Sequence, residues 1–194
     1  NFGLGKQILR SIQKAGYVQP TPVQAAAIPK VMQGNDLIAI AQTGTGKTAA
    51  FVLPMLHRIS EANLSGQPRG TKALILAPTR ELARQIGDVL EPLAGRLQLT
   101  VAVVHGGVAY EPQLAACERG IDVLVACPGR LLELTDRGTI SLAEVCIAAV
   151  AAQKGEQLFA RLVLFHHAIA DIRPVEAGDE IAGFIQSEPG LDLG

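Results

Sequence analysis

The sequence predicts an α/β fold in which a mostly parallel, doubly wound β-sheet is flanked by helices. Five short apolar runs recur between residues 37 and 150, and helix-length segments separate them. Runs that are apolar on both faces are typical of parallel strands buried under crossover helices. A glycine-rich segment, AQTGTGKT at 41–48, directly follows the first run. In such a sheet, ligands bind beyond the carboxyl ends of the strands.

Two helices are expected ahead of the sheet. Apolar residues recur every four positions from Leu4 to Ile12, and Gly16 stands where a helix C-terminus favours positive φ. A second helix is expected between the PTP segment at 20–22 and Gly34. The helices therefore precede the first strand and can cover one face of the sheet.

Five strands are expected to follow, with helices between them. Their ranges are 37–41, 73–77, 99–104, 121–126 and 145–150. Beyond residue 150 the pattern weakens: RLVLF at 161–165 is the best further strand candidate, and 175–184 is rich in turn residues.

The composition is that of an ordinary globular domain. The 194 residues are 48% apolar and 18% charged, with a formal net charge of −1. A nearly neutral chain has no overall field that attracts nucleic acid, so RNA contacts would need locally arranged groups. No apolar run approaches the roughly 18 residues of a membrane-spanning helix, and no signal peptide is evident.

The cysteines favour a reducing compartment. Cys117, Cys127 and Cys146 are scattered, without the spacing of a zinc site or a redox motif. We therefore expect three reduced thiols in a cytoplasmic protein without a membrane partner.

The AQTGTGKT segment predicts a phosphate-binding loop. Gly44 and Gly46 allow backbone amides to curve around phosphate oxygens at the start of a helix, where the helix dipole favours an anion. Lys47 would reach the β- and γ-phosphates, and Thr48 would offer its hydroxyl to Mg²⁺. A glycine-rich turn that happens to contain a lysine is the alternative, but the position between a strand and a helix favours phosphate binding.

An upstream segment, GYVQPTPVQ at 16–24, suits adenine. Tyr17 could stack on a base, and Gln24 could donate and accept at once, as the N6/N7 edge of adenine requires. Taken alone, a core tyrosine beside a helix N-terminus explains this segment better. Because the predicted phosphate loop follows this segment, we favour contact with adenine over a purely structural role.

Five motifs in order resemble the N-terminal RecA-like domain of DEAD-box ATP-dependent RNA helicases, particularly the bacterial type. They are GYVQPTPVQ, AQTGTGKT, PTRELA at 78–83, the Gly106–Gly107 pair and CPGR at 127–130. The resemblance implies a RecA-like P-loop domain with an ATP-binding core segment at 1–145, and a divergent tail at 146–194 that completes the same domain. It implies nucleotide binding by Tyr17, Gln24, Thr43, Gly44, Thr45, Gly46, Lys47 and Thr48.

The resemblance also implies sequence-independent contacts with the sugar-phosphate backbone of RNA. The residues implied are Pro78, Thr79, Arg80, Gly106, Gly107, Gly129 and Arg130. Helices that begin after Thr79 and after Gly129 would present unpaired amides to phosphate, and Arg80 and Arg130 would add charge. A solvated surface role is the alternative for each arginine taken alone.

The resemblance fails where the family carries its Asp-Glu-Ala-Asp sequence. An ungapped continuation puts Ala151, Ala152, Gln153 and Lys154 in those four positions, so the acids that direct magnesium and position water are missing. The Ser-Ala-Thr motif is also missing from 146–194, and Cys127 replaces the usual threonine. Since losing one charge-stabilising group costs on the order of 10²–10³ in rate, we expect hydrolysis near background and retained nucleotide binding.

Other acids and histidines of the tail are weak substitutes. Asp171 and the Asp179–Glu180 pair fit a surface helix cap and a glycine turn better than a strand end. The adjacent His166 and His167 do not suggest a metal, since neighbouring side chains diverge on strands and helices.

The first hypothesis is therefore an ATP-binding and RNA-binding domain of a DEAD-box helicase, left with Lys47 and Thr48 as its catalytic residues. In that family a second RecA-like domain supplies arginine fingers, and we expect no unwinding by this chain without it. The alternative is a non-catalytic nucleotide-binding scaffold, chimeric or degenerate in origin. A small-molecule kinase would leave PTRELA and CPGR unexplained.

Overall fold

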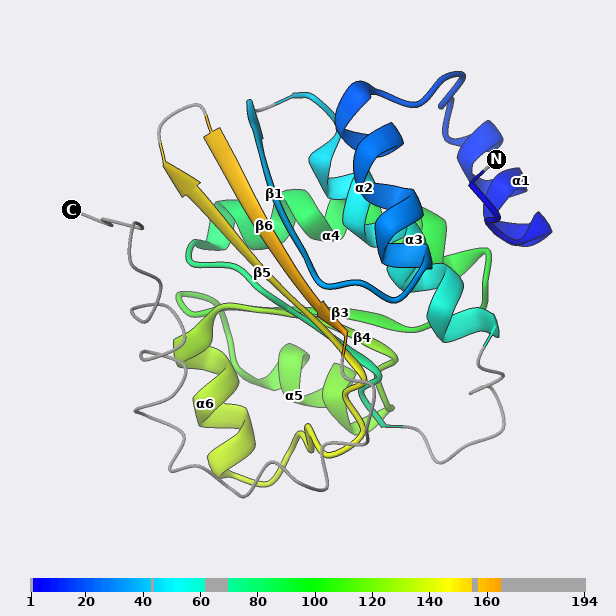
Figure 1. Cartoon of the computed structure of the whole chain (residues 1–194). Coiled ribbons are helices and arrows are strands. Elements are labelled where there is room, and N and C mark those ends of the chain that lie inside the picture. The colour runs from blue at the N-terminus through cyan, green and yellow to red at the C-terminus, as the bar shows by residue number, and fades with distance from the viewer. Residues whose placement is uncertain (1, 43, 62–69, 155–156, 165–194) are drawn as a thin grey trace.

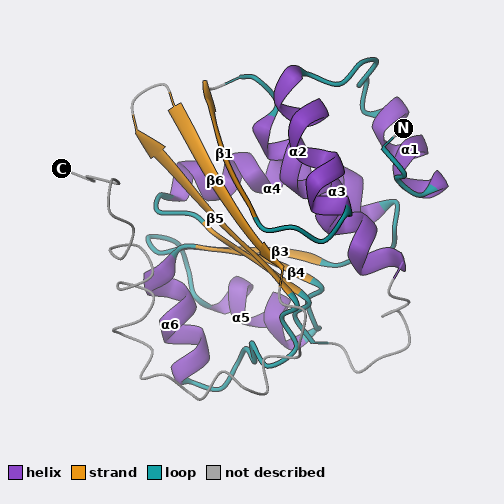
Figure 2. Ribbon diagram, in the orientation of Figure 1, coloured by secondary structure: helices purple, strands orange, loops and turns teal. Residues whose placement is uncertain are grey.

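The computed structural model describes residues 2–42, 44–61, 70–154 and 157–164. A twisted sheet lies between two layers of helices (Figures 1 and 2). The helices are α1 (Lys6–Lys14), α2 (Pro22–Met32), α3 (Lys47–Glu61), α4 (Arg80–Gly95), α5 (Glu111–Glu118) and α6 (Pro128–Asp136). The strands are β1 (Leu37–Gln42), β2 (Ala73–Leu76), β3 (Val101–Val104), β4 (Val123–Ala126), β5 (Ile147–Lys154) and β6 (Gln157–Leu164).

The sheet is mostly parallel, as predicted, with one antiparallel strand. The strand order is β1-β6-β5-β2-β4-β3. β2 pairs in parallel with β4 and β5, and β3 pairs in parallel with β4. β6 runs antiparallel to both of its neighbours, β1 and β5. β6 thus separates the strand that leads into the glycine-rich segment from the rest of the sheet.

The two helical layers bury two apolar clusters. Helices α1 to α4 supply the cluster on one face, which includes Leu56, Ile75 and Ile86. Helices α5 and α6 cover the other face, with Leu124 and Leu131 in the second cluster (Figure 1). Because α3 lies against both α2 and the sheet, its apolar residues are buried almost all round. This packing fixes the position of the loop that precedes α3.

The last two strands are longer than the apolar runs predict. The run at 145–150 becomes a strand that continues to Lys154, and the run at 161–165 becomes a strand that begins at Gln157. Ladder pairing between them explains the extension, since Ala151 pairs with Ala160 and Lys154 with Gln157. Backbone pairing with a neighbouring strand, which a local pattern does not reveal, overrides the weak strand preference of alanine, glutamine and lysine.

Four strands end at one edge of the sheet, and the predicted motifs follow them. Leu76 of β2 pairs with Ala126 of β4, and Ala126 pairs with Val104 of β3, so these three strands end level. PTRELA, CPGR and the glycine pair leave the sheet there, and the glycine-rich segment leaves at the end of β1. This is the carboxyl edge at which doubly wound sheets bind ligands.

Some sequence expectations fall outside the described residues. They concern Thr43, His166–His167, Asp171, Asp179–Glu180 and the turn-rich segment at 175–184. Among the residues that are described, no helix has the length and apolar character needed to cross a membrane.

Candidate nucleotide and nucleic-acid site

The glycine-rich segment forms a tight turn between β1 and α3. Gly44 and Gly46 have φ values of +79° and +82°, a region that favours glycine. The Thr45 hydroxyl donates to the carbonyl of Gln42 over 2.8 Å. α3 begins at Lys47, directly after the turn. The turn therefore curves at the N-terminus of a well-buried helix, where unpaired amides and the helix dipole favour an anion.

Gln24 connects the segment 16–24, which is predicted to contact adenine, to this turn. The Gln24 amide Nε2 donates to the carbonyl of Gly46 over 3.0 Å, and its Oε1 accepts from the Thr21 amide over 3.1 Å. Gln24 and Thr21 also form a capping box that starts α2. A side chain at Gly46 would clash with Gln24 Nε2, so this contact requires glycine. Gln24 is 3% exposed, and its amide braces the phosphate loop.

Lys47 folds back over the turn. Its Nζ donates to the carbonyl of Gln42 and lies 3.4 Å from the Thr45 hydroxyl. Burial lowers the pKa of Lys47, because the charged ammonium loses water. A phosphate in the turn would be an oppositely charged partner for this ammonium. Thr48 lies half-buried in the first turn of α3.

Tyr17 lies beside the core, at the start of the adenine-type segment. It is half-buried and packs against the first apolar cluster, and its amide donates to the Ile12 carbonyl over 3.1 Å. Val18 beside it is 91% exposed. The tyrosine thus combines a core contact with a partly open ring, and base stacking stays a prediction.

A second feature of the edge is a hollow of about 540 Å³ over the ends of β2 and β4. Its lining residues come from three of the predicted motifs: Pro78, Thr79, Arg80, Glu81, Gly106, Gly107 and Cys127. Five of the seven residues predicted to contact RNA line this hollow together. Three strand spacings separate β1 from β2, so the hollow lies roughly 14 Å along the edge from the phosphate loop.

Arg80 and Gly107 meet on one wall of the hollow. Gly107 has φ +76°, and a side chain there would clash with Arg80 Nη1. Thr79 caps α4, since its hydroxyl accepts from the Leu82 amide over 3.2 Å. Thr79 and Arg80 are exposed. The wall therefore combines a helix N-terminus with a guanidinium, the groups that bind phosphate.

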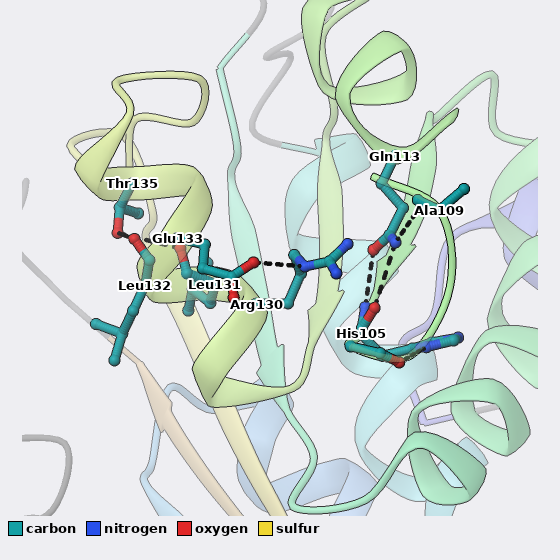
Figure 3. Close-up of polar contacts among 9 residues, drawn as sticks. His105, Ala109, Gln113, Arg130, Leu131, Leu132, Glu133 and Thr135 are labelled. Atoms are coloured by element: carbon teal, nitrogen blue, oxygen red, sulfur yellow. Dashed lines mark hydrogen bonds and ion pairs between the residues drawn. The ribbon is translucent and has the colours of Figure 1, made fainter. Parts of the chain in front are cut away.

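Arg130 is placed differently from the other predicted RNA contacts. Its side chain is 9% exposed and does not line the hollow. Its guanidinium lies 5.2 Å from the centre of the Tyr110 ring. The guanidinium of Arg137 lies 4.7 Å from the centre of the same ring. The Arg130 Nε is 2.9 Å from Glu133 Oε2, an ion pair without the angle of a hydrogen bond (Figure 3). In this arrangement Arg130 fastens α6 to Tyr110, while Gly129 remains exposed.

The sequence did not single out the residues that support the glycine pair. His105 and Gln113 are buried, and they bond to each other between the end of β3 and α5 (Figure 3). Arg84 of α4 donates to the His105 ring over 3.2 Å. One feature could have indicated them: Gln113 lies on the buried face of a short helix. A buried amide needs hydrogen-bond partners, so a nearby polar group was to be expected.

The end of β5 carries no acid. Ala151 is fully buried, and the backbone of β5 continues through Lys154 in register with β6. Lys154 pairs with Gln157, which in turn pairs with Gln42 at the end of β1. Backbone pairing thus aligns Lys154 with the start of the phosphate loop, two strand spacings or roughly 10 Å away.

The donors for a magnesium ion are few. Thr48 offers a hydroxyl at the start of α3, and residues 151–154 offer no carboxylate. Within the described ranges no group of three or more His, Cys, Asp or Glu side chains could hold a metal ion. The residues fit a magnesium ion only as the companion of a bound triphosphate, with Thr48 as its protein ligand.

The three cysteines are unbridged thiols. Burial is the largest effect on each, and it raises the pKa of Cys117, Cys127 and Cys146. Cys127, which lines the hollow, is influenced in addition by Glu81, which raises its pKa, and by Arg80, which lowers it. A raised pKa means a protonated, weakly nucleophilic thiol at neutral pH.

Comparison with known proteins decides the family. The family model described as DEAD/DEAH box helicase matches residues 21–150. The chain belongs to the DEAD/DEAH box helicase family. The match begins at Thr21, so it includes Gln24 but not Tyr17; it covers the phosphate loop and all three motifs around the hollow, and it ends one residue before Ala151.

Named relatives agree with this assignment. The chain is 43% identical over 145 residues to the ATP-dependent RNA helicase DeaD of Buchnera aphidicola, covering 74% of this chain and 23% of the relative. It is 45% identical over 132 residues to the pre-mRNA-processing ATP-dependent RNA helicase prp-5 of Neurospora crassa, covering 68% and 11%. The chain thus spans less than a quarter of the length of these helicases.

Solved structures confirm the predicted fold. The RNA helicase Prp28 from Chaetomium thermophilum bound to ADP matches with a TM-score of 0.68 and 40% identity, over 77% of this chain and 37% of that one. A hypothetical ATP-dependent RNA helicase from Sulfolobus tokodaii matches with a TM-score of 0.66 and 34% identity, over 76% and 41%. The chain therefore has the RecA-like fold of DEAD-box helicases.

Proposed function

We propose that this domain binds ATP or ADP and the backbone of RNA, with hydrolysis and unwinding impaired. The observation that carries the proposal is the shared edge of the sheet. Gln24 braces the phosphate loop there, and Thr79, Arg80 and Gly107 line a separate hollow. Each place lies at a helix N-terminus that can bind an anion: α3 begins at the phosphate loop, and α4 begins at the hollow.

Nucleotide binding is supported by the construction of the phosphate loop. Two glycines with positive φ free the loop backbone, and the Lys47 ammonium lies buried over the turn. An incoming phosphate would take over the hydrogen bonds that Lys47 now gives to Gln42 and Thr45. Tyr17 and the unused N–H of the Gln24 amide are the proposed contacts with adenine.

RNA binding is supported by the chemistry of the hollow. It offers backbone amides at the start of α4, the Arg80 guanidinium and two small glycine surfaces, and none of the described residues that line it is aromatic. Such a lining suits phosphates and sugars rather than base edges, so binding should be independent of sequence. Arg130 and Gly129 would contribute through the position of α6 rather than from inside the hollow.

Impaired hydrolysis is proposed from residues 151–154. The strand reaches the level of the phosphate loop with Ala-Ala-Gln-Lys, and none of these residues supplies a carboxylate to accept a proton from water or to hold a magnesium ion. A magnesium ion, when bound with ATP, would neutralise phosphate charge, and Thr48 is the side chain proposed to hold it. Lys47 would orient the phosphates without supplying the missing acids.

The test is a pair of assays on the same protein. Fluorescent ADP should bind saturably, and Lys47→Ala should weaken this binding, whereas RNA-stimulated phosphate release should stay at background. Phosphate release that disappears with Lys47→Ala would overturn the impaired-hydrolysis proposal. Failure to bind ADP would overturn the nucleotide site altogether.

A non-catalytic scaffold is the second candidate function, and the β5–β6 hairpin favours it. β6 fills the sheet between β1 and β5 by pairing antiparallel with both. In that case ADP would bind without any change in RNA affinity. A helicase-type domain instead predicts that ATP and RNA each change the affinity for the other.

The remaining expectations belong to the same proposal. A second RecA-like domain is the proposed partner in unwinding. A cytoplasmic location is proposed from the three free thiols. Fractionation of cells that express the protein would test the location.

A further inference from the structure

The loop between β3 and α5 is held by the side chain of one buried glutamine. Gln113 is 8% exposed. Its Oε1 accepts from the His105 amide over 2.9 Å, and its Nε2 donates to the carbonyls of His105 over 3.2 Å and Ala109 over 3.1 Å (Figure 3). His105 begins the loop and Ala109 lies near its end. The side-chain amide of Gln113 therefore binds the loop both before and after the glycine pair.

His105 provides a second anchor, to a different helix. Arg84 Nε of α4 donates to His105 Nε2 over 3.2 Å, so Nε2 is an acceptor and the ring hydrogen lies on Nδ1. His105 Nδ1 can then donate to the carbonyl of Gly106, which is 3.0 Å away. His105 as a whole is 6% exposed. It thus connects α4 directly to the first glycine of the pair.

Two arginines of α4 support the loop at successive turns. Arg84 bonds to His105, and Arg80, four residues earlier and therefore on the same side of the helix, packs against Gly107. Arg80 and Gly107 line the hollow, whereas His105, Gln113 and Arg84 do not. The three residues outside the hollow therefore contact the same loop that contributes Gly107 to its wall.

We infer that Gln113 and His105 are positioning residues, which hold the Gly106–Gly107 turn against Arg80 so that this wall is formed before RNA arrives. The inference rests on the proposed binding of RNA in the hollow. A loop fixed in advance loses less conformational freedom when it binds. Gly107 has positive φ, and outside a helix or strand such a turn depends on these side chains for its shape.

The first experiment needs no RNA. Amide hydrogen exchange is measured in the free protein and in two variants, Gln113→Met, which keeps the shape of the side chain, and Arg84→Met, which acts from the exposed surface of α4. Loss of the anchors should speed exchange of the His105 amide, which donates to Gln113, by about 10-fold, since opening free energy controls protection. Exchange in β2 and β4 should not change. Unchanged protection of the His105 amide would overturn the inference.

The second experiment measures affinity for a fluorescent single-stranded RNA by anisotropy. Gln113→Met and His105→Phe should each weaken binding about 10-fold, the equivalent of one or two lost hydrogen bonds. His105→Gln can offer an acceptor near the place of Nε2 and should recover most of the affinity. Fluorescent ADP affinity should stay within about twofold in all of them, because β3 lies five positions from β1 in the strand order.

Two controls separate positioning from charge and from general damage. Arg96→Met removes one positive charge, as Arg84→Met does, but at the C-terminal end of α4. Arg96 donates there to the carbonyl of Pro92, and its loss should leave RNA affinity unchanged. Combining Gln113→Met with Arg80→Ala should give less than the sum of the two losses, because both act through one contact surface. Strict additivity, or an equal loss of ADP and RNA affinity, would assign the residues a purely structural role.

The two proposals fail in different ways. If the wild-type protein binds no RNA, the RNA-binding proposal is wrong, and the role of the two residues in RNA binding is wrong with it. If RNA binds and Gln113→Met leaves its affinity unchanged, RNA binding stands and the positioning role is refuted. The exchange measurement decides in both cases whether the two residues hold the loop.

Discussion

Gln24 and Gly46, 22 residues apart in sequence, are joined by a 3.0 Å hydrogen bond from a side-chain amide to the backbone of the phosphate loop. The same amide accepts from Thr21 at the start of α2. A residue predicted to read adenine therefore also connects two separate elements. Changes in Gln24 should affect the shape of the loop as well as the choice of base.

Gln24→Leu should weaken ADP binding by about 10-fold or more, since it removes a buried hydrogen bond and half of a capping box. Titration with fluorescent ADP measures the change. Gln33→Leu, at the exposed C-terminal end of the same helix, is the matched control and should bind ADP normally. Equal ADP affinity in Gln24→Leu and wild type would contradict the bracing role.

Lys47→Met should reduce ADP affinity by roughly 10- to 100-fold, as expected for losing a charge-assisted bond to phosphate. It should also change how stability depends on pH. Burial lowers the pKa of Lys47 in the folded protein below its ordinary value of 10.5. Between the two pKa values the unfolded chain binds more protons, so the free energy of unfolding rises with pH.

The pH effect is measured by comparing Lys47→Met with wild type in urea unfolding without nucleotide. The unfolding free energy of wild type relative to Lys47→Met should increase as the pH is raised from neutral toward 10.5, the ordinary lysine pKa. The variant lacks the titrating group and supplies the baseline. A relative stability that falls over this range would show that Lys47 is stabilised as a cation in the empty loop.

Gly107→Ala should weaken RNA binding while ADP binding stays normal. The new methyl group would clash with Arg80, and alanine in the left-handed region costs roughly 1–2 kcal/mol. The chain supplies a control one residue away. At Gly106 a methyl group meets no atom within 4 Å, so Gly106→Ala should weaken RNA binding less than Gly107→Ala. Anisotropy that ranks the two variants the other way would place the RNA elsewhere.

Ala151→Asp should destabilise the protein by about 2–4 kcal/mol, because it buries a carboxylate at a fully buried position. Urea unfolding measures the loss. Ala143→Asp, at an exposed position shortly before β5, should change stability by less than about 0.5 kcal/mol. If Ala151→Asp is as stable as Ala143→Asp, the end of β5 is open enough to accept an acid, and restoring the family sequence there becomes feasible.

The sequence determined which segments form the sheet and where its ligands would bind. The apolar runs and the helix-length segments between them locate β1 to β4, because a buried parallel strand needs side chains that are apolar on both faces. Glycine and proline mark the phosphate loop and the helix starts, since these residues control the local backbone. The motifs then meet at one edge because parallel strands end on the same side.

The tertiary structure alone decided the partners of each strand and side chain. β6 lies between β1 and β5 because its backbone pairs with both, and such pairing is not recorded in a local pattern. Arg130 turns to Tyr110 instead of the hollow, and Gln113 finds His105, because buried polar groups take whichever partners the packing brings within reach. Local propensity specifies elements, while contacts between residues far apart in sequence exist only once those elements have packed.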